Sequence, residues 1–304
     1  MVELNDKPPW TGNQLKRLGK AIRANREHEA LEVSYDNVLL WYGELASVVE
    51  SCIKRMEIVS ATGITHLDVT SRPKTIHTLR DKLIAAPELQ LPSVVDIAGV
   101  RIVSDMDLHQ QDDLAKLVAA KLDQEFDQVI SDTRRAPHSG YRALHLRVKL
   151  PAGRVEIQVR TSLQNAWANL YEALADVIGR QIRYGTLPSN PQDRRKVESA
   201  FRTSESLADV EEKKDALRTR RREQDNAYQV LQDSIVRVID LLPESNVIER
   251  NEYAAKLEKC KIDWEAEIQK RKVDDSSNKN NDSELIRQMN SMEEDLRRTR
   301  QRGA

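Results

Sequence analysis

Apolar residues recur at three- and four-residue steps in several parts of the chain, which is the spacing of one face of an amphipathic helix. This pattern predicts helices over 35–56, 75–86, 107–123 and 162–179. The last of these has Gly179 as its stop and is expected to pack its apolar stripe on a β-sheet. The stripe consists of Leu163, Trp167, Leu170, Leu174 and Val177.

Other segments show the patterns of strands. Residues 94–104 form a continuous β-branched run, which predicts a buried central strand, and 65–74 and 127–132 predict short strands. Within 134–161, a turn and two alternating runs predict a hairpin. Successive side chains of a strand point to opposite faces, so one face of the second run is expected to form the floor of a polar cleft. Its polar residues are Glu156, Gln158 and Arg160, and its apolar residues are Val155, Ile157 and Val159.

The composition changes near residue 195, after which the chain is charged and prone to form helix. Long helices are predicted over 204–242, where Pro243 stops the first, and over 251–272, before a polar stretch at 274–283 that predicts a flexible linker. The expected fold class is α+β: a mixed β-sheet flanked by helices, followed by a charged all-helical C-terminal region. The expected divisions are a 1–34 extension, a 35–190 domain, a 195–272 helical region and a 273–304 linker and tail.

Charge and composition argue against a basic protein that binds nucleic acid over its whole surface and against a membrane-spanning protein. The 304 residues include 48 basic and 49 acidic side chains, so a site for nucleic acid or another polyanion must be local. No apolar run approaches the length of about 18 residues that a membrane helix needs, and a cytoplasmic protein without a membrane partner is expected. Cys52 and Cys260 lack metal-ligand spacing and are expected to be free thiols.

Basic residues gather around the start of the 75–86 helix: Arg72, Lys74, Arg80 and Lys82. Cations and free N–H groups at a helix N-terminus suit a polyphosphate, although a solvated charged face has the same pattern. Asp96 precedes a buried strand, where it could equally be a cap. Glu156 interrupts a β run, where acidic residues are disfavoured, so it is expected to serve a ligand. Two carboxylates on adjacent strands supply the hard oxygen ligands of a Mg²⁺–ATP site.

The hairpin adds two candidates for contact with a ligand. Tyr141 follows Gly140 at the turn, where it could stack on a base or anchor the strand. His145, four residues on, is expected on the same face, in contact with a phosphate or packed in the sheet.

Four segments, in this order, resemble the synthetase domain of the RelA/SpoT family, including its small alarmone synthetases and the toxic members of that group. They are "RPKTIHTLRDKL", "DIAGVR", "GYRALH" and "EIQVRT", and "LQNAWANLYEALAD" resembles the helix that follows them in the family. The resemblance spans about residues 35–185 and implies a nucleotidyltransferase-like fold. It also implies pyrophosphate transfer from ATP to a ribose 3′-hydroxyl, by in-line attack on the β-phosphorus with AMP as the leaving group.

The resemblance assigns roles to particular residues. Asp96 and Glu156 would bind Mg²⁺, and Glu156 would orient or deprotonate the attacking hydroxyl. The expected ATP-binding residues are Arg72, Lys74, Lys82 and Arg101. Tyr141 would stack on the acceptor base. The other expected acceptor-binding residues are Arg142, His145, Gln158, Arg160, Arg134 and Arg135.

The chain departs from the family on the acceptor side. Pro137 and Ile130 occupy the places of two lysines that grip the acceptor's 5′ phosphates, and Arg134 and Arg135 are displaced candidates to replace them. The sequence has no histidine–aspartate dipeptide, so the family's hydrolase domain is not expected and the chain is interpreted as a synthetase-only member.

Three functions stay open. The leading one makes guanosine tetra- or pentaphosphate, (p)ppGpp, from GDP or GTP. The second is a toxin that pyrophosphorylates the 3′-CCA end of tRNA, or makes adenosine alarmones. The basic run at 213–222 could hold the tRNA backbone or be a solvated helix face. The third is a non-catalytic nucleotide-binding regulator. The C-terminal helices are candidates for homo-oligomer formation or for binding a cognate antitoxin.

Overall fold

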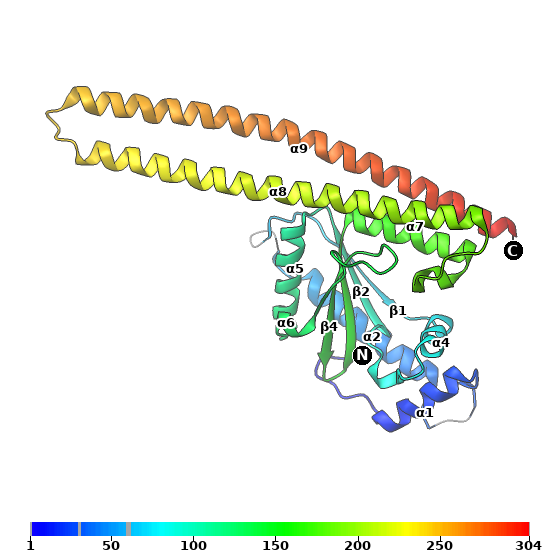
Figure 1. Ribbon diagram of the computed structural model, residues 1–304. Coiled ribbons are helices and arrows are strands. Elements are labelled where there is room, and N and C mark those ends of the chain that lie inside the picture. Colours follow the sequence, from blue (N-terminus) through cyan, green and yellow to red (C-terminus); the bar gives the residue numbers. More distant parts are fainter. Residues whose placement is uncertain (1, 30–31, 59–61, 304) are drawn as a thin grey trace.

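The computed structural model describes residues 2–29, 32–58 and 62–303 (Figure 1). Over these residues it is an α+β structure: a mixed sheet with helices on both faces, and a long helical C-terminal region. The predicted fold class is therefore confirmed. The helices are α1 Gly12–Arg23, α2 Tyr35–Lys54, α4 Ile76–Ala85, η1 Leu91–Ser93, α5 Leu108–Lys121, α6 Phe126–Val129, α7 Ser162–Ile178, η2 Arg180–Tyr184, α8 Pro191–Leu241 and α9 Val247–Gly303.

The described strands are β1 Asp68–Pro73, β2 Ala98–Ser104, β3 Ile130–Asp132, β4 Leu144–Leu150 and β5 Gly153–Thr161. They pair in the order β1-β2-β5-β4-β3. Strands β2 and β5 are parallel, and the other neighbouring pairs are antiparallel. The predicted interior strand and hairpin are thus present. The strand predicted over 127–132 begins only at Ile130, because the residues before it form the single turn α6.

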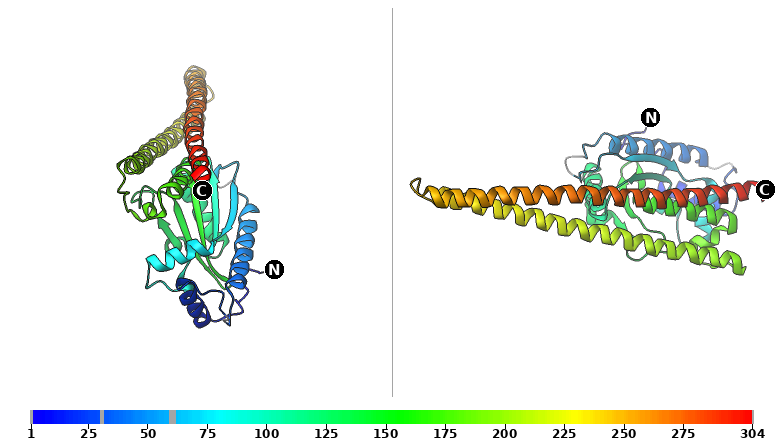
Figure 2. Two further views of the ribbon diagram at one scale, coloured as in Figure 1. Left: turned by 90° about the vertical axis from the view of Figure 1, so that its right-hand side faces the viewer. Right: turned by 90° about the horizontal axis from the view of Figure 1, so that it is seen from above.

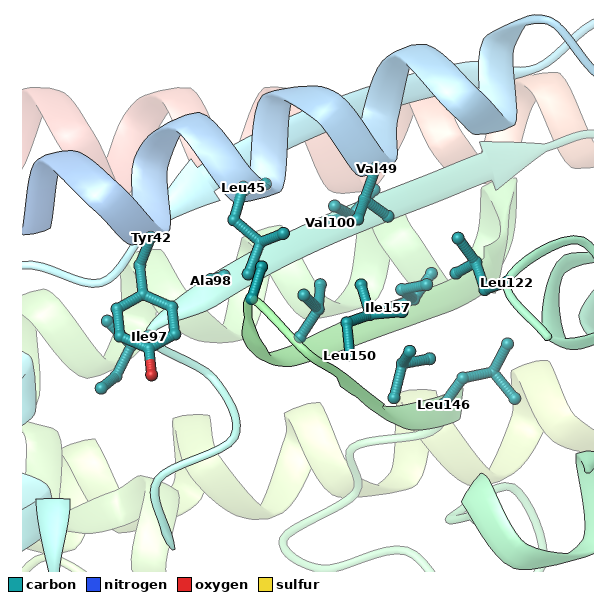
Figure 3. Packing of buried hydrophobic residues seen from close by; sticks show 14 of the residues in the cluster. Tyr42, Leu45, Val49, Ile97, Ala98, Val100, Leu122, Leu146, Leu150 and Ile157 are labelled. Carbon is teal, nitrogen blue, oxygen red and sulfur yellow. The ribbon is translucent and has the colours of Figure 1, made fainter. Parts of the chain in front are cut away.

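One face of the sheet carries the main core. Figure 3 shows Tyr42, Leu45 and Val49 of α2 packed toward the strands. Helix α5 covers the same core, and β5 contributes Ile157, which is fully buried. The alternation along β5 therefore places its apolar residues as predicted. Helix α1 adds to this core through Leu18, which is buried.

The opposite face of β5 is polar, and α7 lies on that side of the sheet (Figure 1). Helix α7 contacts β5 and β2, so it does lie on the sheet as predicted, but its apolar stripe does not face the strands. Trp167, Leu170 and Leu174 instead form a second buried cluster with Leu207 of α8 and Met289 of α9. A polar sheet face offers no partner for an apolar stripe, so α7 turns its stripe toward the two long helices.

Helices α8 and α9 form an antiparallel pair, the helical arm, which extends well beyond the sheet (Figures 1 and 2). Helix α8 ends before Pro243 as predicted. The predicted flexible linker at 274–283 is wrong, because α9 runs through it without a break. The polar residues there find charged partners: Asp275 pairs with Arg221 at 2.5 Å, and Asp282 with Lys214. Among the described helices, none combines the length and the apolar character needed to cross a membrane.

The packing of α7 on the helical arm can be tested with two leucine substitutions. Leu174 is 5% exposed and Leu241, near the tip of the arm, is 85% exposed. We expect Leu174→Ala to lower the free energy of unfolding by about 2 to 5 kcal/mol, because it leaves a cavity between three helices. Leu241→Ala should change it by less than about 0.5 kcal/mol. Urea denaturation measures both, and equal effects would contradict the packing described.

Candidate active site

A polar cleft of about 270 Å³ opens on the face of the sheet that faces α7. Strands β1, β2 and β5 form its floor, the start of α4 forms one wall, and α7 and η2 form the other. Eight of the residues expected at the site from the sequence line it. They are Arg72, Lys74, Asp96, Arg101, Tyr141, Glu156, Gln158 and Arg160.

Asp96 lies in the turn before β2, with both carboxylate oxygens paired. Lys74 Nζ is 2.5 Å from Oδ2, and Lys82 Nζ is 2.9 Å from Oδ1. The backbone brings these groups together, because the β1–β2 ladder ends with the Lys74 N–H donating to the Ile97 carbonyl. The carboxylate is 18% exposed, so solvent screens these pairs only in part. Two cations around one carboxylate leave this wall of the cleft with a net positive charge.

Glu156 occupies the middle of β5, with Gly99 of β2 as its register partner. A side chain at Gly99 would place its Cβ 3.1 Å from the Arg72 carbonyl oxygen, so glycine lets β1 and β2 approach closely beside the carboxylate. His145 Nδ1 lies 3.4 Å from Glu156 Oε1, and Gln158 Nε2 donates to Oε2 at 3.1 Å.

The environment of Glu156 keeps it ionised. Burial alone would raise the pKa of this carboxyl, but the hydrogen bonds from His145 and Gln158 and the charge of nearby Lys82 outweigh burial and lower the pKa to about 2. At neutral pH, the carboxylate can therefore accept a hydrogen bond or coordinate a cation.

Tyr141 is held at the turn that enters β4. Gly140 before it has a φ of +79°, and a Cβ there would lie 2.9 Å from the Trp167 ring, so the turn requires glycine. Arg160 Nη2 donates to the Tyr141 hydroxyl at 2.8 Å, and the guanidinium carbon lies 5.0 Å from the ring centroid. The ring of His145 meets that of Tyr141 edge to face at 5.6 Å. The tyrosine is thus oriented from two sides before any ligand binds.

Arg101 of β2 combines a lowered pKa with the lack of a bonded partner among the described residues. Burial lowers the pKa of its guanidinium, and the neighbouring charges of Arg160 and Arg72 lower it further. The guanidinium of Arg101 makes no hydrogen bond or ion pair with another described residue, and its Nε is buried. Such a group favours the binding of an anion, which would supply both the missing acceptor and the missing charge.

Some expected site residues do not line the cleft. Arg134 bonds to Asp132 and to Asp112, at 2.8 and 2.7 Å. Arg142 turns toward the helical arm, where Nε donates to Ser204 Oγ at 3.2 Å, and Arg135 is exposed. Lys82 and His145 are not lining residues, but they contact the lining carboxylates Asp96 and Glu156, respectively. The structure does not bring the two candidate replacements for the missing lysines into the cleft.

Several lining residues were missed in the sequence. Thr70 alternates with Arg72 on β1, and Thr75 and Thr78 belong to the N-terminal turn of α4, so strand and helix periodicity could have found them. Glu172 and Arg183 have no such signal. They reach the cleft only because α7 and η2 fold back over the sheet.

The donor set fits a magnesium ion that is bound together with a nucleotide. Asp96 and Glu156 both line the cleft, and carboxylate oxygens are preferred Mg²⁺ ligands. The described part of the chain holds no group of three or more histidine, cysteine or acidic residues that could by itself bind a metal ion. Phosphate oxygens would therefore have to complete the coordination, as is usual for Mg²⁺ at phosphoryl-transfer sites.

The match to a known family covers most of the segments that build this cleft. Residues 71–176 match the family model described as the region found in RelA / SpoT proteins. An uncharacterized protein of Mycobacterium bovis is 45% identical over 188 residues, which cover 62% of this chain and 67% of the relative. An uncharacterized protein of Mycobacterium tuberculosis gives the same values. The chain belongs to the RelA/SpoT family.

Two solved structures each align with about three fifths of the chain. The small alarmone synthetase 1 of Bacillus subtilis is 22% identical with a TM-score of 0.45, covering 62% of this chain and 98% of its own. The small alarmone synthetase 2 of the same organism is 21% identical with a TM-score of 0.45, covering 61% and 98%.

The lowered pKa of Glu156 predicts a pH dependence of stability. A folded-state pKa of about 2, below the ordinary value of 4.5, means that the ionised group stabilises the fold above pH 4.5 and loses this effect as the pH falls toward 2. The full effect corresponds to about 3 kcal/mol. Between about pH 6 and pH 3, we expect the free energy of unfolding of the wild type to fall by about 2 kcal/mol more than that of Glu156→Gln. Urea denaturation at the two pH values measures this difference. Parallel losses would show that the carboxylate is not held in this way.

Proposed function

We propose that the chain is an ATP-dependent pyrophosphokinase that transfers the β,γ-pyrophosphate of ATP to a ribose 3′-hydroxyl. The observation that carries this proposal is the pair of carboxylates in the polar cleft. Asp96 is paired with two lysines, and Glu156 is ionised and oriented by His145 and Gln158. Membership of the RelA/SpoT family supports the same class of reaction.

The basic residues of the cleft suit the triphosphate of the donor. Lys74 and Lys82 flank Asp96 at one wall, and Arg72 and Arg101 lie along β1 and β2. When bound, Mg²⁺ would be held by Asp96 and Glu156 and would neutralise part of the phosphate charge. The lysines would exchange their contacts with Asp96 for contacts with phosphate oxygens, so that charge remains balanced as the donor enters.

Glu156 would act on the acceptor. Its carboxylate accepts a hydrogen bond from the 3′-hydroxyl and aims the oxygen at the β-phosphorus. A bond forms between the 3′-oxygen and the β-phosphorus, and the bond from the β-phosphorus to the oxygen shared with the α-phosphate breaks, which releases AMP. With a pKa of about 2, Glu156 is a weak base, so it takes the proton only as the new bond makes the hydroxyl acidic. Positioning would therefore contribute more than basicity.

A guanosine nucleotide, GDP or GTP, is the acceptor that the geometry supports best. Tyr141 lies in the cleft with its orientation set, ready to contact a base. In the basic run at 213–222, the candidate tRNA surface, half of the basic side chains already form ion pairs. Lys214, Arg218 and Arg221 pair with Asp282, Asp107 and Asp275, respectively, whereas Lys213, Arg220 and Arg222 are exposed. The product would be guanosine tetra- or pentaphosphate.

Transfer of label from γ-labelled ATP tests this function. The full chain, with Mg²⁺, is incubated with GDP, GTP, AMP, ADP, no acceptor, or deacylated tRNA. We expect label in a guanosine nucleotide, and Glu156→Gln should reduce the rate at least about 100-fold because the oriented carboxylate is lost. The matched control is Glu223→Gln, the same change at an exposed position of α8, which should not affect the rate.

The other outcomes separate the alternatives. Label in tRNA or in an adenosine nucleotide would keep the transfer reaction and change the acceptor class. Absence of transfer to every acceptor by the folded wild type would overturn the proposal and favour a nucleotide-binding regulator.

A further inference from the structure

The short helix η2 brings to the cleft a residue that belongs to none of the recognised motifs. Gly179 and Gly185, on either side of η2, have φ values of +129° and +84°, a region that favours glycine, and they turn the chain back after α7. The Tyr171 hydroxyl donates to the carbonyl oxygen of Ile182 at 2.9 Å, and Ile182 is fully buried. The next residue, Arg183, lines the cleft.

The guanidinium of Arg183 has carboxylate partners at Nη2 but no hydrogen-bond acceptor at Nε among the described residues. Its Nη2 pairs with Glu172 and lies 3.7 Å from Asp176, both on α7. Its Nε is buried and has no hydrogen-bond partner in the described part of the chain. A buried N–H without an acceptor is unfavourable, so a ligand oxygen at this position would be favoured.

The same condition occurs at two more arginines of this cleft. The Nε atoms of Arg101 and Arg160 are also buried and without partners among the described residues. Arg160 uses its Nη atoms for Tyr141, Gln158 and Asn165, whereas Arg101 has no bonded partner within the described ranges. Buried donors on like-charged groups in one cavity are typical of a site for an anion.

Neighbouring acids neutralise this cluster only in part. Glu172 pairs with Arg183. Asp176 is divided among three cations: Arg180 and Arg183 at 3.7 Å and Arg300, near the end of α9, at 2.8 Å. Among the described residues, neither Arg101 nor Arg160 forms an ion pair with a carboxylate, although the charge of Glu172 offsets part of the effect of burial on the pKa of Arg101.

We propose that Arg183, together with Arg101, binds a phosphate group in the polar cleft. This anion subsite is separate from the lysine pair around Asp96. The inference rests on the proposed function, because its ligand is a nucleotide phosphate. The phosphate belongs either to ATP or to the acceptor. If the phosphate belongs to the acceptor, Arg183 supplies a cation in place of the two missing lysines, whose positions are occupied by Pro137 and Ile130. This cation comes from η2, a different part of the fold.

Equilibrium binding to the full chain tests the subsite without requiring transfer. Calorimetry with Mg²⁺ would use the non-hydrolysable ATP analogue AMPCPP, and separately GDP, with adenosine and guanosine as phosphate-free probes. We expect Arg183→Gln to weaken one phosphorylated ligand at least about tenfold, because a charge-assisted hydrogen bond is lost, and to leave its nucleoside unchanged. The ligand that is weakened identifies the source of the phosphate.

Arg180→Gln is the matched control. Arg180 belongs to the same short helix and pairs with Asp81 of α4 at 3.5 Å, but it does not line the cleft. Its substitution should change binding less than about twofold. Arg183→Lys keeps the charge but not the planar guanidinium, so it should lose an intermediate amount of nucleotide affinity. It replaces Arg183→Gln in the test if that variant does not fold.

Three outcomes overturn the inference. If Arg183→Gln, or Arg183→Lys in its place, binds both nucleotides as tightly as the wild type, there is no subsite, and the proposed function is unaffected. If phosphorylated ligand and nucleoside weaken equally, or if Arg180→Gln has the same effect, Arg183 only holds η2 in place. If the wild type binds neither nucleotide, the inference and the proposed function fail together.

Discussion

The alternation of side chains along β5 is the constraint on which the rest of the structure depends. One face of this strand completes the apolar core with α2 and α5, and the other forms the floor of the polar cleft. A helix that covers the cleft cannot bury an apolar stripe against that floor. Helix α7 therefore needs a second apolar surface, and the helical arm provides it through Leu207 and Met289. The arm is thus part of the scaffold of the site.

The charges of the cleft follow from the same arrangement. Lysines pair with Asp96 at the wall formed by α4, whereas arginines gather on the strands and beneath α7 with fewer partners. Several donors in the cleft are buried without acceptors among the described residues, which is unusual in a folded protein and is typical of functional sites. The fold holds Arg101 and Arg160 in place through the paired strands β2 and β5, and Arg183 through η2, which Gly179 and Gly185 flank.

The parts of the site that depend on local periodicity could be predicted from the sequence. The two faces of β5, the carboxylates Asp96 and Glu156, and the position of Tyr141 follow from strand alternation and from the order of the motifs. Contacts between distant segments could not be predicted. Arg134 had the right charge for an acceptor site, but Asp112, more than twenty residues away, binds it elsewhere. Arg183 reaches the cleft only through the turn after α7.

The same distinction explains the error at 274–283. Asparagine, serine and aspartate lower helix propensity there, yet partners on α8 hold the segment in a helix. Sequence composition describes the isolated segment, and the tertiary ion pairs decide its structure.

The position of Met289 in the cluster behind α7 has a consequence for synthesis on the ribosome. Chains grow from the N-terminus, and residues 71–161, which supply the floor of the cleft, emerge well before α9 is complete. Until residues near Met289 and Leu296 are available, Trp167 and Leu174 lack part of their buried surroundings. A nascent chain can therefore pair its strands early, but the wall of the cleft formed by α7 becomes firmly held only when α9 has been made.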